Sequence, residues 1–231
     1  MRFHDRREAG RRLARRLCEP THNGRLRNPV VLALPRGGAP VAGEVAQALH
    51  APLDVLVARK IGAPFNPELG VGALAGEDPP LYDERALEVL GLTPGQLASH
   101  VERERAELHR HEQLYRCGRP PSDVRNRTVI VVDDGLATGV TARVALRTVR
   151  RRGPARVVLA VPVCSREAAT AVRPEADDLV CLHQPDTFGA VGLWYENFEQ
   201  AADEEVIDAL RASPSHEPLR RLRRPDAPCP P

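Results

Sequence analysis

The sequence predicts an α/β fold in which an open parallel sheet is flanked by helices, and three features support this class. Two apolar runs, at 30–34 and 129–132, have the continuous aliphatic content of strands that are buried on both faces. Each run ends in a glycine-containing turn, and a segment with helical spacing of its apolar residues follows. Strand-like and helix-like segments then alternate as far as residue 182. Such alternation is typical of a parallel sheet with right-handed crossovers.

The individual elements can be placed from the same patterns. Residues 5–17 put Ala9, Leu13 and Leu17 on one helical face, with arginines around the rest of the helix. The predicted strands are 30–34, 53–58, 129–132, 157–163 and 179–182, and the other predicted helices are 41–50, 94–116, 166–172 and a segment carrying Ala142, Ala145, Leu146 and Val149. We expect these helices to cover both faces of the sheet.

The length of 231 residues suits one substantial core. We expect a single domain over 1–213, with a helical flap inserted at about 77–125 and a small hood at about 186–213. Residues 214–231 are rich in Pro and Arg and poor in apolar side chains, which predicts a disordered tail.

Composition argues against several classes of protein. With 33 basic and 31 acidic residues the formal net charge is +2, so no global basic field indicates nucleic-acid binding, and the arginine clusters at 6–16 and 220–224 are interpreted as a solvated helix face and tail. The five cysteines are far apart and include no C-x-x-C pair, which predicts neither a disulfide framework nor a zinc site. The polar N-terminal residues and the lack of an apolar run of ~18 residues favour a cytoplasmic protein that does not cross a membrane.

The most informative segment is 129–141, where the apolar strand ends in Asp133 and Asp134 and a small, hydroxyl-bearing loop follows. Ligands of open parallel sheets bind at the carboxyl ends of the strands. The N–H groups of a loop that opens a helix can hold a phosphate, and Thr138 and Thr141 add hydroxyl donors. The two carboxylates are suited to hold sugar hydroxyls or a metal ion. The segment therefore predicts a sugar-phosphate site.

Other interpretations of this segment fit less well. A P-loop requires lysine where the chain has Val140, and a phosphoacceptor receiver domain requires a lysine at a later strand end, whereas the only lysine, Lys60, lies upstream. No G-x-G-x-x-G stretch supports a dinucleotide fold. A buried strand with an ordinary acidic turn is the structural alternative.

The order of an apolar run, two acids and a loop of the form A-T-G-x-T resembles the phosphoribosyl pyrophosphate motif of type I phosphoribosyltransferases. The resemblance implies that Asp133 and Asp134 bind the ribose 2′ and 3′ hydroxyls, and that the 5′-phosphate is bound by Ala137, Thr138, Gly139, Val140 and Thr141. It also implies Mg²⁺ as the cofactor, with Asp133 and Asp134 as its candidate ligands, and transfer of phosphoribosyl to a nitrogenous base with release of pyrophosphate. The expected setting is nucleotide metabolism and nucleoside salvage.

Two upstream positions are candidates for the pyrophosphate. Arg36, Gly37 and Gly38 follow the first strand, where the resemblance places the pyrophosphate loop, although a Gly-Gly turn alone is equally compatible with a purely structural role. Lys60 is the only lysine among 33 basic residues. A compact ammonium group suits a tight pyrophosphate contact, which predicts a catalytic role, and chance retention is the alternative.

The hood contains half of the chain's eight Phe, Trp and Tyr residues, within 188–198. This segment resembles the hood of purine phosphoribosyltransferases, which makes Phe188 and Trp194 candidates for stacking on a base. A small satellite core packed by the same aromatic side chains is the alternative.

The acceptor base stays open, as does the choice between a monomer and a homodimer. Enzymes for 6-oxopurines resemble one another in an Asp immediately before the Thr-Gly, and here that residue is Ala137, so hypoxanthine and guanine are disfavoured. The alternative function is a non-catalytic regulator that senses phosphoribosyl pyrophosphate. Such regulators usually carry a nucleic-acid-binding module, and the sequence shows no recognisable one.

Overall fold

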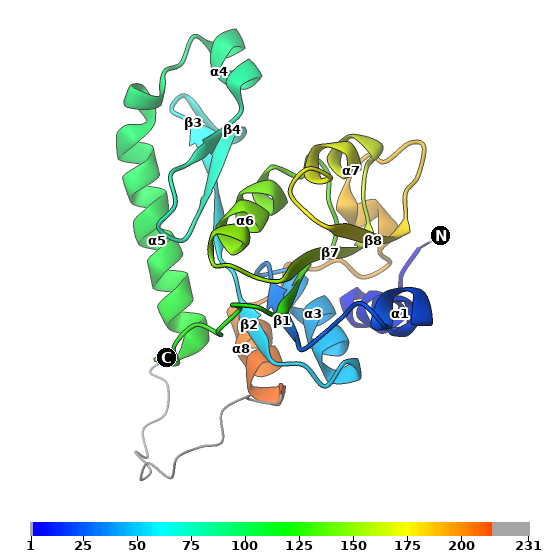
Figure 1. Cartoon of the computed structure of the whole chain (residues 1–231). Coiled ribbons are helices and arrows are strands. Elements are labelled where there is room, and N and C mark those ends of the chain that lie inside the picture. Colours follow the sequence, from blue (N-terminus) through cyan, green and yellow to red (C-terminus); the bar gives the residue numbers. More distant parts are fainter. Residues whose placement is uncertain (1, 214–231) are drawn as a thin grey trace.

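The core of the computed structural model is a five-stranded parallel sheet in the order β2-β1-β6-β7-β8 (Figure 1). The structure describes residues 2–213, so the tail for which the sequence predicts disorder lies outside the described residues. The strands are β1 (Pro29–Ala33), β2 (Leu53–Val55), β6 (Thr128–Val132), β7 (Arg156–Val163) and β8 (Asp178–His183). The predicted parallel α/β class is confirmed.

Helices cover both faces of this sheet because alternate residues of each strand point to opposite sides. Ile130 joins the core that lies against α1, α3 and α8, whereas Val129 and Val131 join the core against α6 and α7. The helices are α1 (Arg6–Cys18), α2 (Pro20–Asn23), α3 (Gly38–Ala48), α6 (Val140–Arg151), α7 (Arg166–Val172) and α8 (Asp203–Ala212). Burial on both faces explains the uninterrupted apolar run of the central strand.

The order of the strands reverses between β1 and β6. From β1 the chain passes through α3 to β2 on one side, and from β6 it passes through α6 and α7 to β7 and β8 on the other. The two strands pair in parallel as far as Ala33 and Val132, and the Leu34 amide then donates to the Val132 carbonyl at 2.9 Å. The loops after β1 and β6 therefore leave the same edge of the sheet side by side, at the position where open α/β sheets bind ligands.

A second, antiparallel sheet stands beside the first and corrects one predicted strand. The segment 53–58 is not continuous: β2 ends at Val55, and Ala58 begins a hairpin of β3 (Ala58–Ala63) and β4 (Asn66–Ala75). The pairing is irregular at Gly62, where the carbonyl oxygen of Pro67 would lie 2.3 Å from an added Cβ. Such a strand has no uninterrupted apolar run, which is why the apolar pattern does not find it.

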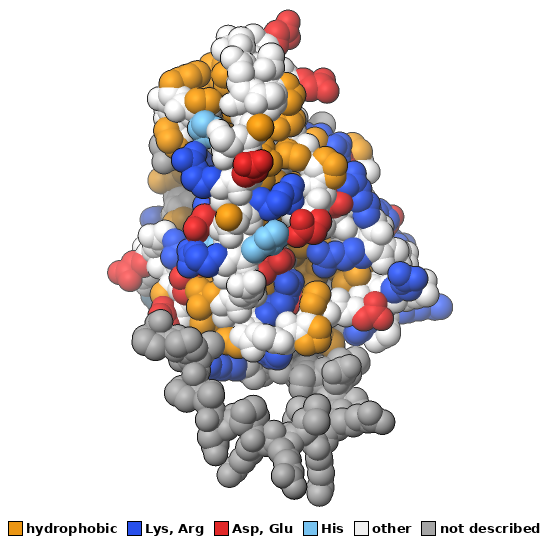
Figure 2. Space-filling view, turned by 90° about the vertical axis from the view of Figure 1, so that its left-hand side faces the viewer, with side chains coloured by type: hydrophobic (Ala, Val, Ile, Leu, Met, Phe, Trp, Pro, Cys, Tyr) orange, Lys and Arg blue, Asp and Glu red, His pale blue; other side chains and the backbone are white. Residues whose placement is uncertain are grey.

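The hairpin belongs to a projecting unit, residues 58–116, which we call the arm (Figure 1). It also contains β5 (Leu81–Tyr82), α4 (Glu84–Leu90), a 3₁₀ turn η1 (Pro94–Leu97) and α5 (Ala98–Arg116). The predicted insertion at 77–125 therefore overlaps only the later part of the arm and continues beyond its end at residue 116. The predicted helix at 94–116 begins four residues later than predicted, after the 3₁₀ turn. In Figure 2, the face that carries the arm has Lys and Arg side chains interspersed with Asp and Glu, without a continuous basic surface.

A buried ion pair fastens the arm to the edge strand of the main sheet. Asp54 and Arg116 are less than a tenth exposed, and the Arg116 Nε atom donates to Asp54 Oδ1 at 3.0 Å. Arg116 also donates to the Val55 carbonyl, and the Ser122 amide donates to Asp54 Oδ2. These additional hydrogen bonds satisfy both charged groups, as burial requires.

The described residues 2–213 contain four of the five cysteines and the helices that could be considered as membrane spans. In this range no helix combines the length and the apolar content needed to cross a membrane. Cys18, Cys117, Cys164 and Cys181 are free thiols in the structure, and Cys229 lies outside the described residues.

Candidate active site

The candidate site is built on the two adjacent loops that follow β1 and β6. Their close approach requires glycine in the first loop: an added Cβ on Gly37 would lie 2.1 Å from Asp134 Oδ2, and one on Gly38 would lie 2.7 Å from the Val132 carbonyl oxygen. Side chains at these positions would push the loops apart. The glycine pair thus has a structural role in addition to its predicted contact with pyrophosphate.

The two acids share a partly buried position between these loops. The Asp134 amide donates to Asp133 Oδ1 at 2.9 Å, and Arg6 Nε donates to Asp134 Oδ2 at 2.8 Å. Burial raises the pKa of Asp133 well above its ordinary value, and the neighbouring Asp134 carboxylate raises it further. Burial also raises the pKa of Asp134, whereas the hydrogen bond and charge of Arg6 act in the opposite direction. The pair is therefore suited to face hydroxyl donors or positive charge.

The loop after the acids leads into the N-terminus of α6. Gly139 adopts a left-handed conformation with φ of 76° and caps the helix, while Ala137 and Thr138 are exposed. Loop N–H groups at a helix N-terminus form a favourable environment for a phosphate. The predicted phosphate-binding residues therefore lie together at one end of α6.

Ser165, which was not among the predicted site residues, fixes this loop by hydrogen bonds. Its hydroxyl donates to the Ala137 carbonyl at 2.6 Å and accepts from the Ala168 amide at 2.9 Å, so the same side chain caps α7. The Ser165 amide also donates to the Leu136 carbonyl. A serine directly before a helix is an N-cap signal that sequence reading could have used.

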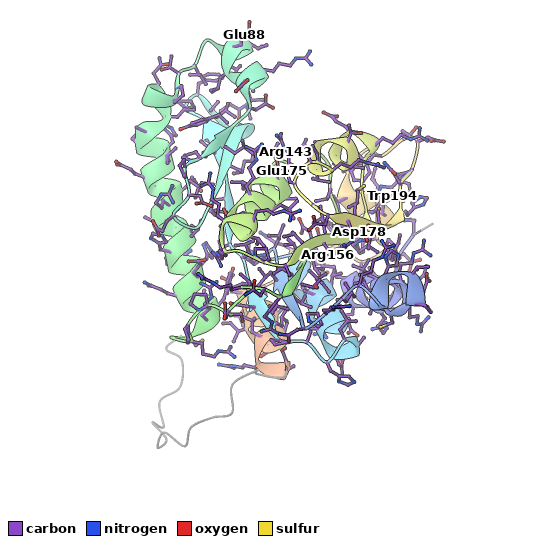
Figure 3. All side chains as sticks on the ribbon, viewed as in Figure 1. Glu88, Arg143, Arg156, Glu175, Asp178 and Trp194 are labelled. Atoms are coloured by element: carbon purple, nitrogen blue, oxygen red, sulfur yellow. The ribbon has the colours of Figure 1, made fainter. Side chains whose placement is uncertain are left out.

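The hood aromatics pack with one another and with the N-terminal segment. Trp194, in the segment that follows β8 (Figure 3), donates through Nε1 to the Phe188 carbonyl at 3.0 Å. Both side chains are partly buried against a small core that contains Phe3 and Tyr195. The satellite core that the sequence left as an alternative is therefore present, and stacking of Phe188 and Trp194 on a base stays a prediction.

The hood also lies against the acid motif. An added Cβ on Gly135 would be 2.6 Å from a methyl group of Val191, and the Tyr195 hydroxyl donates to the Asp134 carbonyl at 2.6 Å. The aromatic segment and the two acids therefore form one continuous structure.

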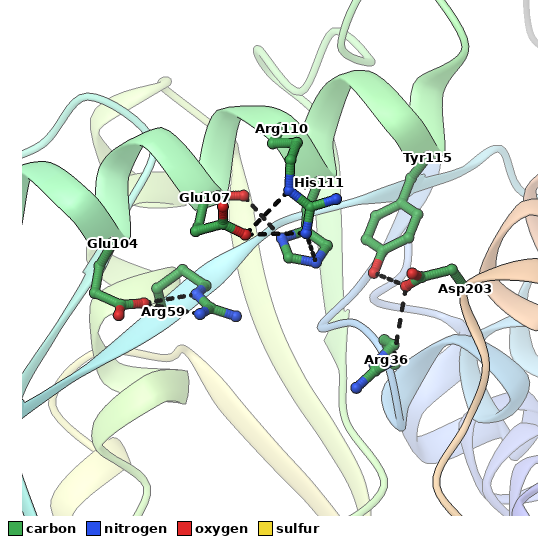
Figure 4. Close-up of polar contacts among 8 residues, drawn as sticks. All are labelled: Arg36, Arg59, Glu104, Glu107, Arg110, His111, Tyr115 and Asp203. Atoms are coloured by element: carbon green, nitrogen blue, oxygen red, sulfur yellow. Dashed lines mark hydrogen bonds and ion pairs between the residues drawn. The ribbon is translucent and has the colours of Figure 1, made fainter. Parts of the chain in front are cut away.

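Arg36 points toward α8. Its guanidinium lies 4.0 Å from Asp203 Oδ1, which also accepts a hydrogen bond from Tyr115 at 2.6 Å (Figure 4). Asp203 and Tyr115 are contributed by α8 and α5, far from Arg36 in sequence, and the sequence analysis did not select them. The Arg36 guanidinium therefore lies beside an acid of α8 at the edge of the loop.

Lys60 lies in the arm rather than at a strand end of the main sheet. It is exposed and pairs with Ala73 across the β3–β4 hairpin. Directly opposite residues of an antiparallel pair share a face, and Ala73 packs with Val144 of α6, so Lys60 lies on the face of the hairpin that meets α6. Lys60 also lines a cavity of about 280 Å³ together with Arg59, His100 and Arg103.

The acid pair fits Mg²⁺ only together with oxygen atoms of a substrate. Within residues 2–213, no group of three or more His, Cys, Asp or Glu side chains is placed to hold a metal ion. Mg²⁺ is commonly bound by one or two carboxylates plus substrate phosphates, and Asp133 and Asp134 can supply the carboxylates. An all-protein magnesium cage is therefore not expected from this part of the chain.

Comparison with known proteins agrees with this geometry. The family model described as phosphoribosyl transferase domain matches residues 5–196, and the chain therefore belongs to the phosphoribosyl transferase domain family. The crystal structure of TT1426 from Thermus thermophilus is 41% identical in sequence and superposes with a TM-score of 0.77, covering 93% of this chain and 100% of that one. The family predicted from the acid motif is thus confirmed.

Two curated relatives show how far the similarity extends. A provisionally named phosphoribosyl transferase from Mycobacterium tuberculosis is 42% identical over 208 residues, which cover 90% of this chain and 46% of that protein. The chain therefore spans about half the length of that relative. A uracil phosphoribosyltransferase from Lactobacillus gasseri is 33% identical over 93 residues, or 39% of this chain and 43% of that protein.

The variant Gly37→Ala tests the close approach of the two loops. Because the new Cβ would lie 2.1 Å from Asp134 Oδ2, the loop or the carboxylate must move, and we expect the free energy of unfolding to fall by about 1–3 kcal/mol. Gly95→Ala is the matched control, because a Cβ there meets no atom within 4 Å; it should leave stability unchanged or raise it by about 0.4–1 kcal/mol. Urea unfolding compares the two, and equal stabilities would contradict the contact.

Proposed function

We propose that the chain is a phosphoribosyltransferase that transfers a 5-phosphoribosyl group from phosphoribosyl pyrophosphate to a nitrogenous base and releases pyrophosphate. The observation that carries this proposal is the juxtaposition of Asp133, Asp134 and the loop at the N-terminus of α6, at the point where the strand order reverses. Acids and phosphate-binding amides side by side suit the two ends of a ribose 5-phosphate. A cytoplasmic location and a role in nucleotide salvage belong to the same proposal and rest on the family.

Each part of the site has a role in this reaction. The two carboxylates accept hydrogen bonds from the ribose 2′ and 3′ hydroxyls, and the loop 137–141 holds the 5′-phosphate. Arg36, the Gly37-Gly38 amides and Lys60 receive the pyrophosphate, for which Arg36 exchanges its contact with Asp203. When bound, Mg²⁺ supplies positive charge that stabilises the departing pyrophosphate.

The chemistry needs no covalent nucleophile from the protein. A ring nitrogen of the base forms a bond to ribose C1 and loses its proton, while the bond from C1 to the pyrophosphate oxygen breaks. The bonding electrons leave with the pyrophosphate, which together with water takes up the proton. Positive charge that develops on the sugar lies near the carboxylates of Asp133 and Asp134. Catalysis then comes from orientation and from charge stabilisation, which together lower the barrier without a protein-bound intermediate.

A sensor of phosphoribosyl pyrophosphate is the second candidate. It would use the same ligand contacts without turnover, and a regulator of this kind needs a surface for its target. The face shown in Figure 2 mixes both signs of charge and offers no continuous basic surface to a nucleic-acid target. The enzyme is therefore the better-supported function for this part of the chain.

Ligand binding is tested by thermal unfolding with phosphoribosyl pyrophosphate and Mg²⁺. Ligand at about 100 times its Kd should stabilise the folded chain by about 2.7 kcal/mol, which raises the Tm. Asp134→Asn should remove most of this shift, because it weakens the acceptor for ribose hydroxyls. Asp186→Asn is the control: Asp186 is exposed and pairs with Arg166, so this variant should retain the full shift in Tm. A wild-type chain that millimolar ligand does not stabilise would contradict both candidate functions.

The acceptor is tested by following pyrophosphate release with a panel of bases. Because Ala137 offers no carboxylate to a purine ring nitrogen, we expect little or no product from hypoxanthine or guanine. Adenine and uracil belong in the panel. The Ala-Thr-Gly loop resembles the loops of adenine and uracil phosphoribosyltransferases, and the Lactobacillus gasseri relative is named as a uracil phosphoribosyltransferase. Robust product from either 6-oxopurine would show that another residue addresses the ring nitrogen.

The variant Lys60→Arg separates a catalytic lysine from a solvated one. If the ammonium contacts the departing pyrophosphate, turnover should fall by about tenfold to a thousandfold, as it does when a single charge-stabilising donor is lost. Stability should change by no more than about 0.5 kcal/mol, because the side chain is exposed. Arg103→Lys, which exchanges another cation of the same cavity, is the control and should leave kcat unchanged. Unchanged kcat in Lys60→Arg would remove this residue from the site.

A further inference from the structure

Arg6 differs from the other arginines of the N-terminal helix. The sequence suggests a solvated face for the whole cluster, yet the Arg6 side chain is only 12% exposed and its partner Asp134 is 14% exposed. Arg7 and Arg11 instead lie near Glu44 with side chains that are about half exposed or more. One member of the cluster therefore points inward, to the acid motif.

Arg6 is itself held in place by the hood. Its guanidinium carbon lies 4.0 Å from the centre of the Phe198 ring, and its Nη1 atom donates to the Glu199 carbonyl at 2.7 Å. A planar guanidinium can stack on an aromatic ring and still donate from its edge to two acceptors. A lysine ammonium at this position has no plane to stack and cannot reproduce both hydrogen bonds together with the stacking.

The contacts form a closed ring around Asp134. Phe198 stacks on Tyr195 with ring centres 4.9 Å apart, and the Tyr195 hydroxyl donates to the carbonyl of Asp134. The side chain of Asp134 is thus fixed by Arg6, and its backbone is fixed by Tyr195. Gly37 closes the remaining side, because there is no room for even a Cβ beside Asp134 Oδ2.

We propose that Arg6 is a positioning residue for ribose recognition, which acts by fixing the orientation of the Asp134 carboxylate. With Oδ2 occupied by Arg6, Oδ1 is the atom that accepts from a ribose hydroxyl. This inference rests on the proposed function, because it takes Asp134 as a ribose-binding acid. It assigns to the N-terminal helix a role in the site that its sequence does not reveal.

The test measures affinity for ribose 5-phosphate by calorimetry in the absence of Mg²⁺. This ligand carries the hydroxyls and the 5′-phosphate but no pyrophosphate, so it reports on the ribose subsite without a metal. Arg6→Lys keeps the positive charge and should weaken binding by about tenfold, and Arg6→Gln should weaken it by about tenfold to a hundredfold, as expected when charge-assisted hydrogen bonds are lost. Arg11→Lys is the control from the same helix and should bind as the wild type does.

A double-mutant cycle shows whether Arg6 acts through Asp134. If it does, Arg6→Lys combined with Asp134→Asn should bind no more weakly than Asp134→Asn alone. In steady-state kinetics, kcat/KM for phosphoribosyl pyrophosphate should fall in Arg6→Lys, while the KM for the base stays unchanged. A purely structural arginine would lower the Tm without this selectivity.

Four results would overturn the inference. If Arg6→Lys binds ribose 5-phosphate with wild-type affinity, the proposed function stands but Arg6 has no role in it. Additive losses in the cycle would mean that Arg6 does not act through Asp134. A fall in Tm without a change in Kd would reduce Arg6 to a structural contact. A wild-type chain without affinity for ribose 5-phosphate would overturn the inference and count against the proposed function as well.

Discussion

The parallel pairing of β1 with β6 is the contact on which the candidate site depends. Since the chain order reverses at this pair, no crossover helix separates the loops that leave the two strands, and both loops reach the same edge of the sheet. Gly37 and Gly38 then allow the first loop to lie directly on the acids of the second. The α6 N-terminus and the hood are placed relative to this pair, so a shift in strand register would displace the whole site.

The sheet could be predicted from the sequence because burial on two faces leaves a direct record in a strand. Residues 129–132 are apolar without interruption for this reason, and the Gly-containing turn after them marks where the strand ends. The hairpin of the arm shows no such uninterrupted apolar pattern in its sequence. β3 includes exposed Lys60 and a register shift at Gly62, and both strands of the hairpin also contact α5 and α6, which are distant in sequence from much of the hairpin.

Some residues of the candidate site could likewise be predicted from local sequence, whereas others could not. The acids and the phosphate loop are consecutive in sequence, so their order alone indicates their chemistry. Arg6 and Asp134 are 128 residues apart, and nothing in either segment identifies the other as its partner. The Ser165 contact with Ala137 lies between these cases, because its helix-capping role is visible locally while its support of the loop requires the fold.

The ring of contacts around Asp134 also affects the order in which parts of the chain can fold during synthesis. Arg6 belongs to the first helix, whereas Tyr195, Phe198 and the Glu199 carbonyl follow the last strand of the main sheet. A chain that emerges N-terminus first can pair all five strands before these partners exist. The scaffold is thus complete by residue 183, but the acid that follows its central strand becomes aligned only when the two ends of the domain meet.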